Sequence, residues 1–228
     1  MWAKLNNAQD TIEEIISFPK TMLINGTTYP RQIFQWSTSE LKAVGIVPVT
    51  TSGTHLNEKY YMEKAEAFAI AGDKNSVVKT IGEKVADKNL ADVNEVWTQA
   101  QIDAGEAPDG TKANDPKNDV DGSQIVTKGL KTLAKEKADI DANGKLQRFD
   151  WLIQRKVTAE TAIPSAVVTY MANIRTDHSD ICTAIENASD LNAFIALHND
   201  TFKEDGSVDV VARVNRWTAD TNVKQYRR

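Results

Sequence analysis

The residues from Asp139 to Asp150 have the spacing of an EF-hand-type calcium loop. Oxygen-bearing side chains stand at positions one, three, five and twelve, and they belong to Asp139, Asp141, Asn143 and Asp150. Gly144 occupies position six, where such a loop turns sharply. The acid at position twelve is aspartate instead of the longer glutamate, which weakens bidentate closure. These residues are the candidate calcium ligands of the chain.

A second interpretation of the same run is an Asp- and Asn-rich turn between two helices. Asn143 and Gly144 would then end the first helix, and Asp150 would lie near the start of the next. The nearest candidate partner loop, residues 117–128, has lysines where the first and last ligands are needed, and unpaired loops bind weakly. We therefore predict no strong calcium binding and assign no metal ligand.

Residues 177–180, with the sequence DHSD, contain the residue types of a hydrolytic triad. Consecutive residues of a helix point in different directions, so these side chains cannot form the hydrogen-bonded relay that such catalysis needs. We interpret His178 as a packed residue on the apolar stripe of a helix and Cys182 as a buried structural thiol. No function is assigned to His55 or His198.

Other signatures of catalysis are missing from the sequence. It has no glycine-rich phosphate loop and no G-x-S-x-G, H-E-x-x-H or C-x-x-C motif. It has three histidines and one cysteine, so a histidine-based metal centre would need scattered partners. We therefore predict a protein without catalytic residues and without a cofactor.

The composition is that of an ordinary globular protein. Of the 228 residues, 41% are hydrophobic and 26% are charged, and the formal net charge is −5. This acidic balance argues against nucleic acid as a partner. A local basic group lies near the C-terminus and consists of Arg213, Arg216, Lys224, Arg227 and Arg228. The sequence has no run of eighteen apolar residues and no leader pattern, so we expect neither a membrane span nor a secretory signal.

Local signals in the first 55 residues predict a small α+β module. Asn25-Gly26 lies between two short apolar or β-favouring runs, which is the pattern of a two-residue hairpin turn. Ser37 and Glu40 have the spacing of a capping box, and Gly45 is placed to end the helix that they begin. We expect a hairpin, a short helix and an exit strand. The expected core of this module contains the aromatic residues Tyr29, Phe34 and Trp36.

The remainder of the chain is predicted to be helical, because its apolar residues recur at three- and four-residue spacing. Gly, Pro, Asp and Asn gather between Asp103 and Ser123 and indicate a linker. Pro164 begins the longest predicted helix, and another helix starts near Ser189. The predicted fold class is mainly α with an N-terminal α+β module. Its segments are a docking module (1–55), a helical segment (56–102), a polar linker (103–124) and a C-terminal helical domain (125–228).

Several short segments resemble tail-fibre and tail-associated structural proteins of tailed bacteriophages, especially marine ones. These segments are FDWLIQRK at 149–156, TAIP at 161–164, VTY at 168–170, IRT at 174–176 and AIENA at 184–188. The run YPRQIF at 29–34, with the following WS, EL and GIVP, is similar to the N-terminal segment of the same kind of protein. The resemblance implies that Trp151 anchors a core and that Arg155 pairs with a carboxylate such as Asp150 or Glu160.

This resemblance also implies a role in a virion. The expected protein is a non-enzymatic structural component of the tail or baseplate region that connects or attaches fibres. It contacts other virion proteins in several copies per particle and is made in the cytoplasm of the bacterial host. The alternative is a tail-fibre assembly chaperone that is absent from the mature particle, since such chaperones have a similar D-W and Arg pattern near their end. A hydrolase of host surface polymers ranks third, because no acidic pair is singled out.

Overall fold

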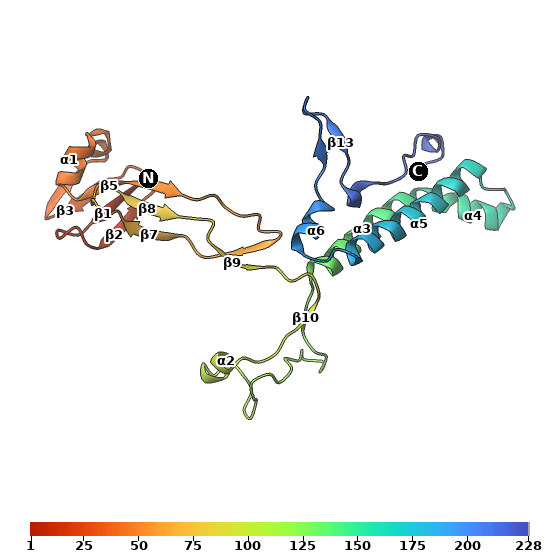
Figure 1. Ribbon diagram of the computed structural model, residues 1–228, viewed down its shortest axis with the longest axis horizontal. Helices are drawn as coiled ribbons and strands as arrows, with labels where there is room; N and C mark the ends of the chain where they lie inside the picture. Colours follow the sequence, from red (N-terminus) through yellow and green to blue (C-terminus); the bar gives the residue numbers. More distant parts are fainter. Residues whose placement is uncertain (228) are drawn as a thin grey trace. The chain divides into compact units, whose positions relative to one another are not determined.

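The computed structural model describes residues 1–227 and divides into two compact units, of which the first is Met1–Asp87 and the second begins at Lys88 (Figure 1). The secondary structure is 35% helix and 22% strand, so the expectation of a mainly α fold is wrong. The units join between Asp87 and Lys88, whereas we expected the boundary in residues 103–124.

The first unit is built on a five-stranded sheet with the strand order β2-β1-β5-β8-β7. Its strands are β1 (Trp2–Leu5), β2 (Ile12–Ile16), β5 (Ile46–Ser52), β7 (Ala67–Ile70) and β8 (Val77–Thr80). The first half of β5 pairs antiparallel with β1, and its second half pairs parallel with β8, where Val49 lies opposite Val77. Strand β5 therefore links the N-terminal hairpin of the sheet to the β7–β8 hairpin.

The predicted hairpin is confirmed. Strands β3 (Met22–Ile24) and β4 (Thr27–Tyr29) pair antiparallel around Asn25 and Gly26. Both turn residues have positive φ, 49° and 78°, as a two-residue hairpin turn requires.

The predicted capped helix is also confirmed, as α1 (Thr38–Ala43). The Ser37 hydroxyl accepts a hydrogen bond from the Glu40 backbone N–H, and the Glu40 carboxylate accepts one from the Ser37 backbone N–H at 2.9 Å. Gly45 follows this helix with φ of +81°, a value that favours glycine. A short 3₁₀ helix, η1 (Arg31–Gln35), precedes α1.

The core of this module differs from the expectation in one aromatic residue. Phe34 is buried and packs against Trp2 with 4.8 Å between ring centroids. Tyr29 packs against the edge of the same cluster. Trp36 was expected in the core, but 42% of it is exposed, and its ring meets Tyr29 edge-on at the surface. It follows the last residue of η1, on an extended backbone that turns its side chain away from the buried cluster.

The helices predicted in residues 56–102 are wrong, apart from the short α2 (Gln99–Asp103). Residues 61–87 instead form β6 (Tyr61–Glu63), β7, β8 and β9 (Lys84–Asp87), and β6 pairs antiparallel with β9. The apolar residues of this region include many Val and Ile, whose branched side chains favour strands. Their spacing fits a helix, but pairing with β5, which is distant in sequence, decides the structure.

The second unit begins with an arm, residues 88–129, that extends outward and returns to its own starting point, next to Leu130. The arm contains β10 (Val93–Asn94), α2 and β11 (Val126–Thr127), and its two strands pair antiparallel. The Asn89 carbonyl accepts a hydrogen bond from the Leu130 backbone N–H at 2.9 Å, so the two ends of the arm meet. The predicted linker, residues 103–124, is the outer part of this arm.

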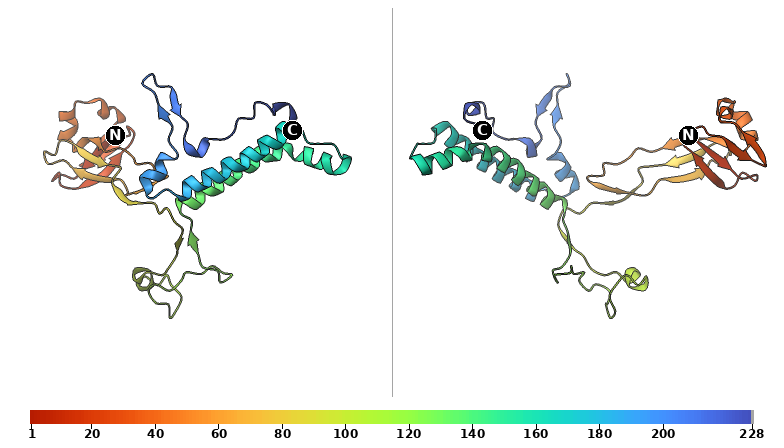
Figure 2. Two further views of the ribbon diagram at one scale, coloured as in Figure 1. Left: turned by 45° about the vertical axis from the view of Figure 1, so that its right-hand side comes forward. Right: turned by 180° about the vertical axis from the view of Figure 1, so that it is seen from behind.

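The helical part of the second unit contains α3 (Leu130–Leu146), α4 (Asp150–Ala159), α5 (Ser165–Glu186) and α6 (Leu191–Ala196). Figures 1 and 2 show α3 and α5 side by side, and Lys131 at the start of α3 donates a hydrogen bond to the carbonyl of Glu186 at the end of α5. The two helices are therefore antiparallel. Pro164 is the residue before the first turn of α5, which confirms the predicted proline-initiated helix.

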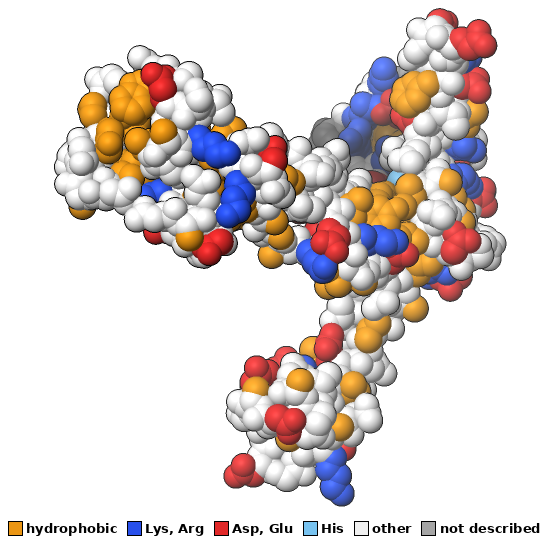
Figure 3. Space-filling view, turned by 60° about the vertical axis from the view of Figure 1, so that its left-hand side comes forward, with side chains coloured by type: hydrophobic (Ala, Val, Ile, Leu, Met, Phe, Trp, Pro, Cys, Tyr) orange, Lys and Arg blue, Asp and Glu red, His pale blue; other side chains and the backbone are white. Residues whose placement is uncertain are grey.

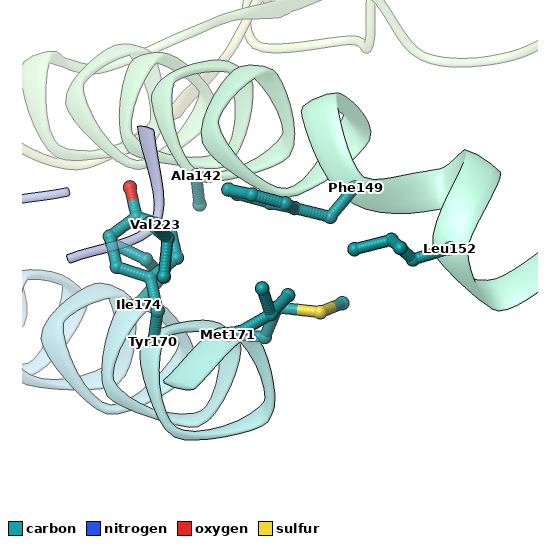
Figure 4. Close-up of a cluster of buried hydrophobic side chains, with 8 residues drawn as sticks. Ala142, Phe149, Leu152, Tyr170, Met171, Ile174 and Val223 are labelled. Atoms are coloured by element: carbon teal, nitrogen blue, oxygen red, sulfur yellow. The ribbon is translucent and has the colours of Figure 1, made fainter. Parts of the chain in front are cut away.

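The core of this unit lies where α3, α4 and α5 meet the C-terminal segment (Figure 4). Its buried residues are Ala142, Phe149, Leu152, Val167, Tyr170, Met171, Ile174 and Val223. The C-terminal segment contains β12 (Thr201–Phe202), β13 (Val208–Val210) and the 3₁₀ helices η3 (Arg213–Asn215) and η4 (Lys224–Tyr226). Another 3₁₀ turn, η2 (Gln147–Phe149), joins α3 to α4. Within residues 1–227, none of the helices combines the length and apolar character that a bilayer crossing requires.

Candidate functional site

The most extensive candidate site is a pair of two-stranded ribbons in the second unit that have no core of their own. None of residues 88–128, all of which the structure describes, is buried. Residues 201–211, which contain the β12–β13 ribbon, are all exposed. An isolated two-stranded hairpin is only marginally stable in water, because two strands bury too little apolar surface. Backbone hydrogen bonds hold these ribbons together without support from a core of their own.

Apolar side chains lie on the surface of both ribbons. The exposed apolar residues of the arm are Val93, Val120, Ile125 and Val126, and those of the other ribbon are Phe202, Val208, Val210 and Val211. The exposed fraction of Phe202 is 64%. Single exposed apolar residues are normal, but several on a strand pair with free edges form a surface on which another strand or sheet can pack.

The helices also present apolar residues to solvent. On α3, Leu133 and Ile140 are seven residues apart, at the spacing of one helical face, and Ile140 is 70% exposed. On α4, Val157 is 77% exposed. Figure 3 shows hydrophobic side chains at the surface of the helical part, beside Lys, Arg, Asp and Glu. The surface of this unit thus offers mixed apolar and charged contacts, as transient and assembly interfaces do.

The structure does not form the EF-hand-type loop. Asp139, Asp141 and Asn143 lie within helix α3, and Gly144 continues the same helix. An EF-hand loop needs residues one, three and five to turn around one point, whereas a helix directs them apart. The Asp141 carboxylate forms an ion pair with Lys137 one turn earlier, at 3.0 Å. The calcium-loop interpretation is therefore wrong. The alternative is wrong in ending the first helix at Asn143 and Gly144, but Asp150 does begin the next helix, α4, as it expected.

The DHSD run behaves as predicted, because its side chains go to different partners. Asp177 accepts a hydrogen bond from the Thr218 backbone N–H at 2.6 Å, and Asp180 lies 3.5 Å from Arg213. His178 faces α3, where its Nε2 lies 2.6 Å from the Asp139 carboxylate. No relay joins the members of this run.

One further cluster spans α3 and α5 and joins three metal-ligating residue types. Asp139, His178 and Cys182 each offer one ligand atom, and the three atoms lie within 4.8 Å of one another. Cys182 Sγ is 3.5 Å from His178 Nε2. Burial and the nearby Asp139 carboxylate raise the pKa of the Cys182 thiol, and Lys135 acts weakly in the opposite sense. His178 and Cys182 are partly exposed, so neither is the fully packed residue that we expected.

The remaining predicted residues have structural partners. Trp151 anchors α4 to the C-terminal segment by donating to the Tyr226 carbonyl at 3.0 Å. Arg155 lies over the Trp151 ring, 5.2 Å from its centroid, and no ion pair joins it to Asp150 or Glu160 among residues 1–227. The expected ion pair of Arg155 is therefore wrong.

The other two histidines and the basic group also have local partners. His55 pairs with Glu63, and His198 Nδ1 donates a hydrogen bond to the Phe194 carbonyl at 3.0 Å. In the basic group, Arg213 pairs with Asp180 and Arg227 pairs with Asp220, while Arg228 lies outside the described residues. These acidic neighbours reduce the positive charge available to an anionic partner.

A comparison of this chain with protein-family models, curated proteins and solved structures finds no match in any of the three.

The sequence contained a signal for the Asp139–His178–Cys182 cluster that our sequence analysis missed. His178 and Cys182 are four residues apart in a predicted helix, which places their side chains on one face. The third residue, Asp139, is far away in sequence, and only the antiparallel packing of α3 and α5 brings it near. The sequence indicated the exposed ribbons less clearly than this cluster. The many Asp, Asn, Gly and Pro residues of the arm predicted only a polar segment.

Proposed function

We propose that this protein is a non-enzymatic structural protein that connects components of a larger assembly, and that the assembly is the tail or baseplate region of a tailed-phage particle. The observation that supports the connecting role is the pair of coreless ribbons, residues 88–129 and 201–211. The assignment to a phage tail rests on the sequence resemblance alone.

The ribbons support this role because their order requires contacts beyond their own residues. In the arm, backbone hydrogen bonds hold the two strands together, but no buried side chain offsets the loss of conformational entropy. Packing on a partner would bury the exposed apolar residues of the ribbons and satisfy the free strand edges. A subunit that is completed by its neighbours behaves in this way.

The solvent-accessible surface area of the chain also supports a connecting role. The chain exposes 14663 Å². Two separate compact domains with the lengths of the two units would together expose about 12,300 Å². The excess of roughly 2,300 Å² is larger than the share of about 800 Å² that one partner buries in a standard interface. The chain therefore has surface for more than one neighbour.

The residues that carry the resemblance are structural in this fold. Phe149 and Leu152 of the FDWLIQRK segment are buried, and so are Tyr170 of the VTY segment and Ile174 of the IRT segment. They form the core that holds α4 and α5 to the C-terminal segment (Figure 4). A segment of this kind would recur because it maintains a scaffold, which fits a structural protein.

The test is the composition of purified particles. We expect mass spectrometry of clean virions to find the protein at several copies per tail. A fibre-assembly chaperone would be abundant in the infected cell and missing from the particle. Absence from clean virions would therefore overturn the structural role.

A deletion variant tests the role of the arm. Replacing residues 93–128 by a short Gly-Ser linker keeps Asp92 and its bond to the Gly129 backbone N–H. It should leave the helical signal and the thermal transition of the helices intact, because the ends of the arm meet. The same variant should fail to complement a phage that lacks the gene. A matched control, Asn173→Ala, changes an exposed residue of α5 outside both ribbons and should complement fully. Full complementation by the arm deletion would show that the arm is not an attachment surface.

A further inference from the structure

Asp139, His178 and Cys182 form a site whose geometry is suited to a metal ion. Helix α5 supplies His178 and Cys182 one turn apart, and helix α3 supplies Asp139 from across the helix pair. Among residues 1–227, no lysine or arginine forms an ion pair with the Asp139 carboxylate, because the nearby Lys135 pairs with Glu186 and Lys137 pairs with Asp141. The carboxylate is therefore available to a cation.

The two contacts of His178 Nε2 cannot both be good hydrogen bonds. Its Nε2 faces both Asp139 Oδ1, at 2.6 Å, and Cys182 Sγ, at 3.5 Å. One ring nitrogen carries either one proton or one lone pair. If Nε2 carries a proton and donates it to Asp139, the Cys182 thiol has no acceptor at this nitrogen. If Nε2 instead accepts from the thiol, its lone pair is occupied and the Asp139 oxygen faces another acceptor. A cation in place of the proton would bind the nitrogen, the carboxylate and the sulfur together.

The separation of the sulfur and nitrogen ligand atoms fits a tetrahedral site. Zinc bonds of about 2.3 Å to sulfur and about 2.0 Å to nitrogen place these two ligand atoms about 3.5 Å apart in a tetrahedron. The observed separation of Cys182 Sγ and His178 Nε2 is 3.5 Å. The Asp139 oxygen would have to move slightly away from the nitrogen, and its side chain is 57% exposed and has room to rotate.

We propose that Asp139, His178 and Cys182 bind a zinc ion or a similar borderline divalent cation, with the fourth position open to water. Binding replaces the thiol proton of Cys182 with the metal and releases that proton to solvent, while His178 binds as the neutral ring. The ion would cross-link α3 to α5 near the middle of the helix pair. This site is independent of the ribbons, so it stands or falls apart from the proposed function.

Metal binding at this site has to displace the Cys182 thiol proton, because the thiolate is the metal ligand. Two negatively charged ligands and a neutral imidazole also match the preference of zinc for mixed sulfur, nitrogen and oxygen sites.

The test uses cobalt(II) as a spectroscopic probe on the full-length protein. We expect one equivalent to produce the intense visible bands of a tetrahedral site and a near-ultraviolet sulfur-to-cobalt charge-transfer band. Zinc should remove both by competition. Because the chain has a single cysteine, the charge-transfer band reports Cys182 directly. Zinc should also protect this thiol from alkylation.

Matched variants separate the site from adventitious binding. Cys182→Ser should abolish the charge-transfer band, and His178→Gln and Asp139→Asn should each weaken cobalt binding by more than about tenfold, since even residues behind the ligands affect affinity that much. His55→Gln, which changes a histidine of the first unit, should bind like the wild type. Circular dichroism checks that each variant is folded. No charge-transfer band in the wild type, or a band that survives in folded His178→Gln, would overturn the site.

Discussion

The Trp151 indole N–H donates a hydrogen bond to the backbone carbonyl of Tyr226, with 3.0 Å between the two heavy atoms. This bond joins α4 to the end of the chain, 75 residues later. Val223, three residues before Tyr226, is buried in the cluster formed by α3, α4 and α5. The C-terminal segment is therefore part of the helical core.

Replacing Trp151 by Phe should lower the free energy of unfolding of the helical unit by about 1 kcal/mol, because the ring stays while the donor to Tyr226 is lost. Thermal and denaturant unfolding followed by circular dichroism measures the change. Trp36→Phe is the control, since Trp36 lies at the surface of the other unit and should change stability by less than about 0.5 kcal/mol. Equal effects of the two substitutions would contradict the assignment.

Phe34 and Trp36 should respond differently to truncation. Phe34→Ala removes a buried ring that packs against Trp2, and it should cost about 3 kcal/mol or more. Trp36→Ala removes a ring that is 42% exposed and should cost about 1 kcal/mol. Unfolding of the first unit measures both. A larger loss for Trp36 than for Phe34 would mean that the aromatic core is misassigned.

Gly53 and Gly82 follow strands β5 and β8, at a place where the two chain segments lie close together. A Cβ on Gly53 would lie 2.1 Å from the Ile81 carbonyl oxygen, and a Cβ on Gly82 would lie 1.9 Å from that of Thr54. Both residues also have positive φ. Gly82→Ala should therefore destabilise the first unit by more than about 2 kcal/mol.

Gly26→Ala is the control for this comparison, since Gly26 has positive φ but no atom within 4 Å of its would-be Cβ. Its cost should be about 1 kcal/mol, from backbone strain alone. If both variants lose the same stability, the close approach at Gly82 contributes nothing.

Gly144 distinguishes a helix from a calcium loop. It lies inside α3 with an open space beside it, so Gly144→Ala should stabilise the helical unit by about 0.5–1 kcal/mol. In an EF-hand loop the same glycine makes the sharp turn, and alanine would destabilise it. Thermal unfolding with and without millimolar calcium gives the answer. A loss of stability on Gly144→Ala would support the loop.

Asp92 should make the base of the arm sensitive to acid. Hydrogen bonds from the Thr132 side chain and the Gly129 backbone N–H hold the pKa of Asp92 below its ordinary value. A carboxyl group whose pKa is lower in the folded protein than in the unfolded chain stabilises the fold. This stabilisation is complete above the ordinary pKa of about 3.9, and it is lost as the pH falls through the pKa of the folded state.

Asp92→Asn should therefore reduce stability at neutral pH and flatten its dependence on pH below about 4. Thermal unfolding of both proteins across this range measures the difference. Asp121→Asn is a suitable control, because the pKa of Asp121 is also lowered, but by a bond to Ser123 within the arm. Parallel acid profiles for wild type and Asp92→Asn would contradict the role of Asp92.

The features that were predictable from the sequence are those that neighbouring residues determine. The Asn25-Gly26 turn, the Ser37–Glu40 capping box and the helix after Pro164 each depend on residues within one or a few turns. Such signals act before any tertiary contact, and the structure contains all of them.

The errors arise where distant segments decide the local structure. Val77 to Thr80 forms a strand because β5 pairs with it, and residues near Asp139 form a helix because α5 packs along it. Neither pairing is visible in a short window of sequence. The Asp139–His178–Cys182 cluster was hidden for the same reason, since its members meet only when α3 and α5 pack.

The arm has a further consequence for the gene. Its two ends lie against each other, because a Cβ on Gly129 would lie 2.3 Å from the Ala91 carbonyl carbon. Two recombination events, one near the codon of Ala91 and one near that of Gly129, would therefore exchange the whole segment without shifting the helices that follow. Selection can alter the length and sequence of the segment while the rest of the second unit stays constant. Related genes should then diverge most between these two codons.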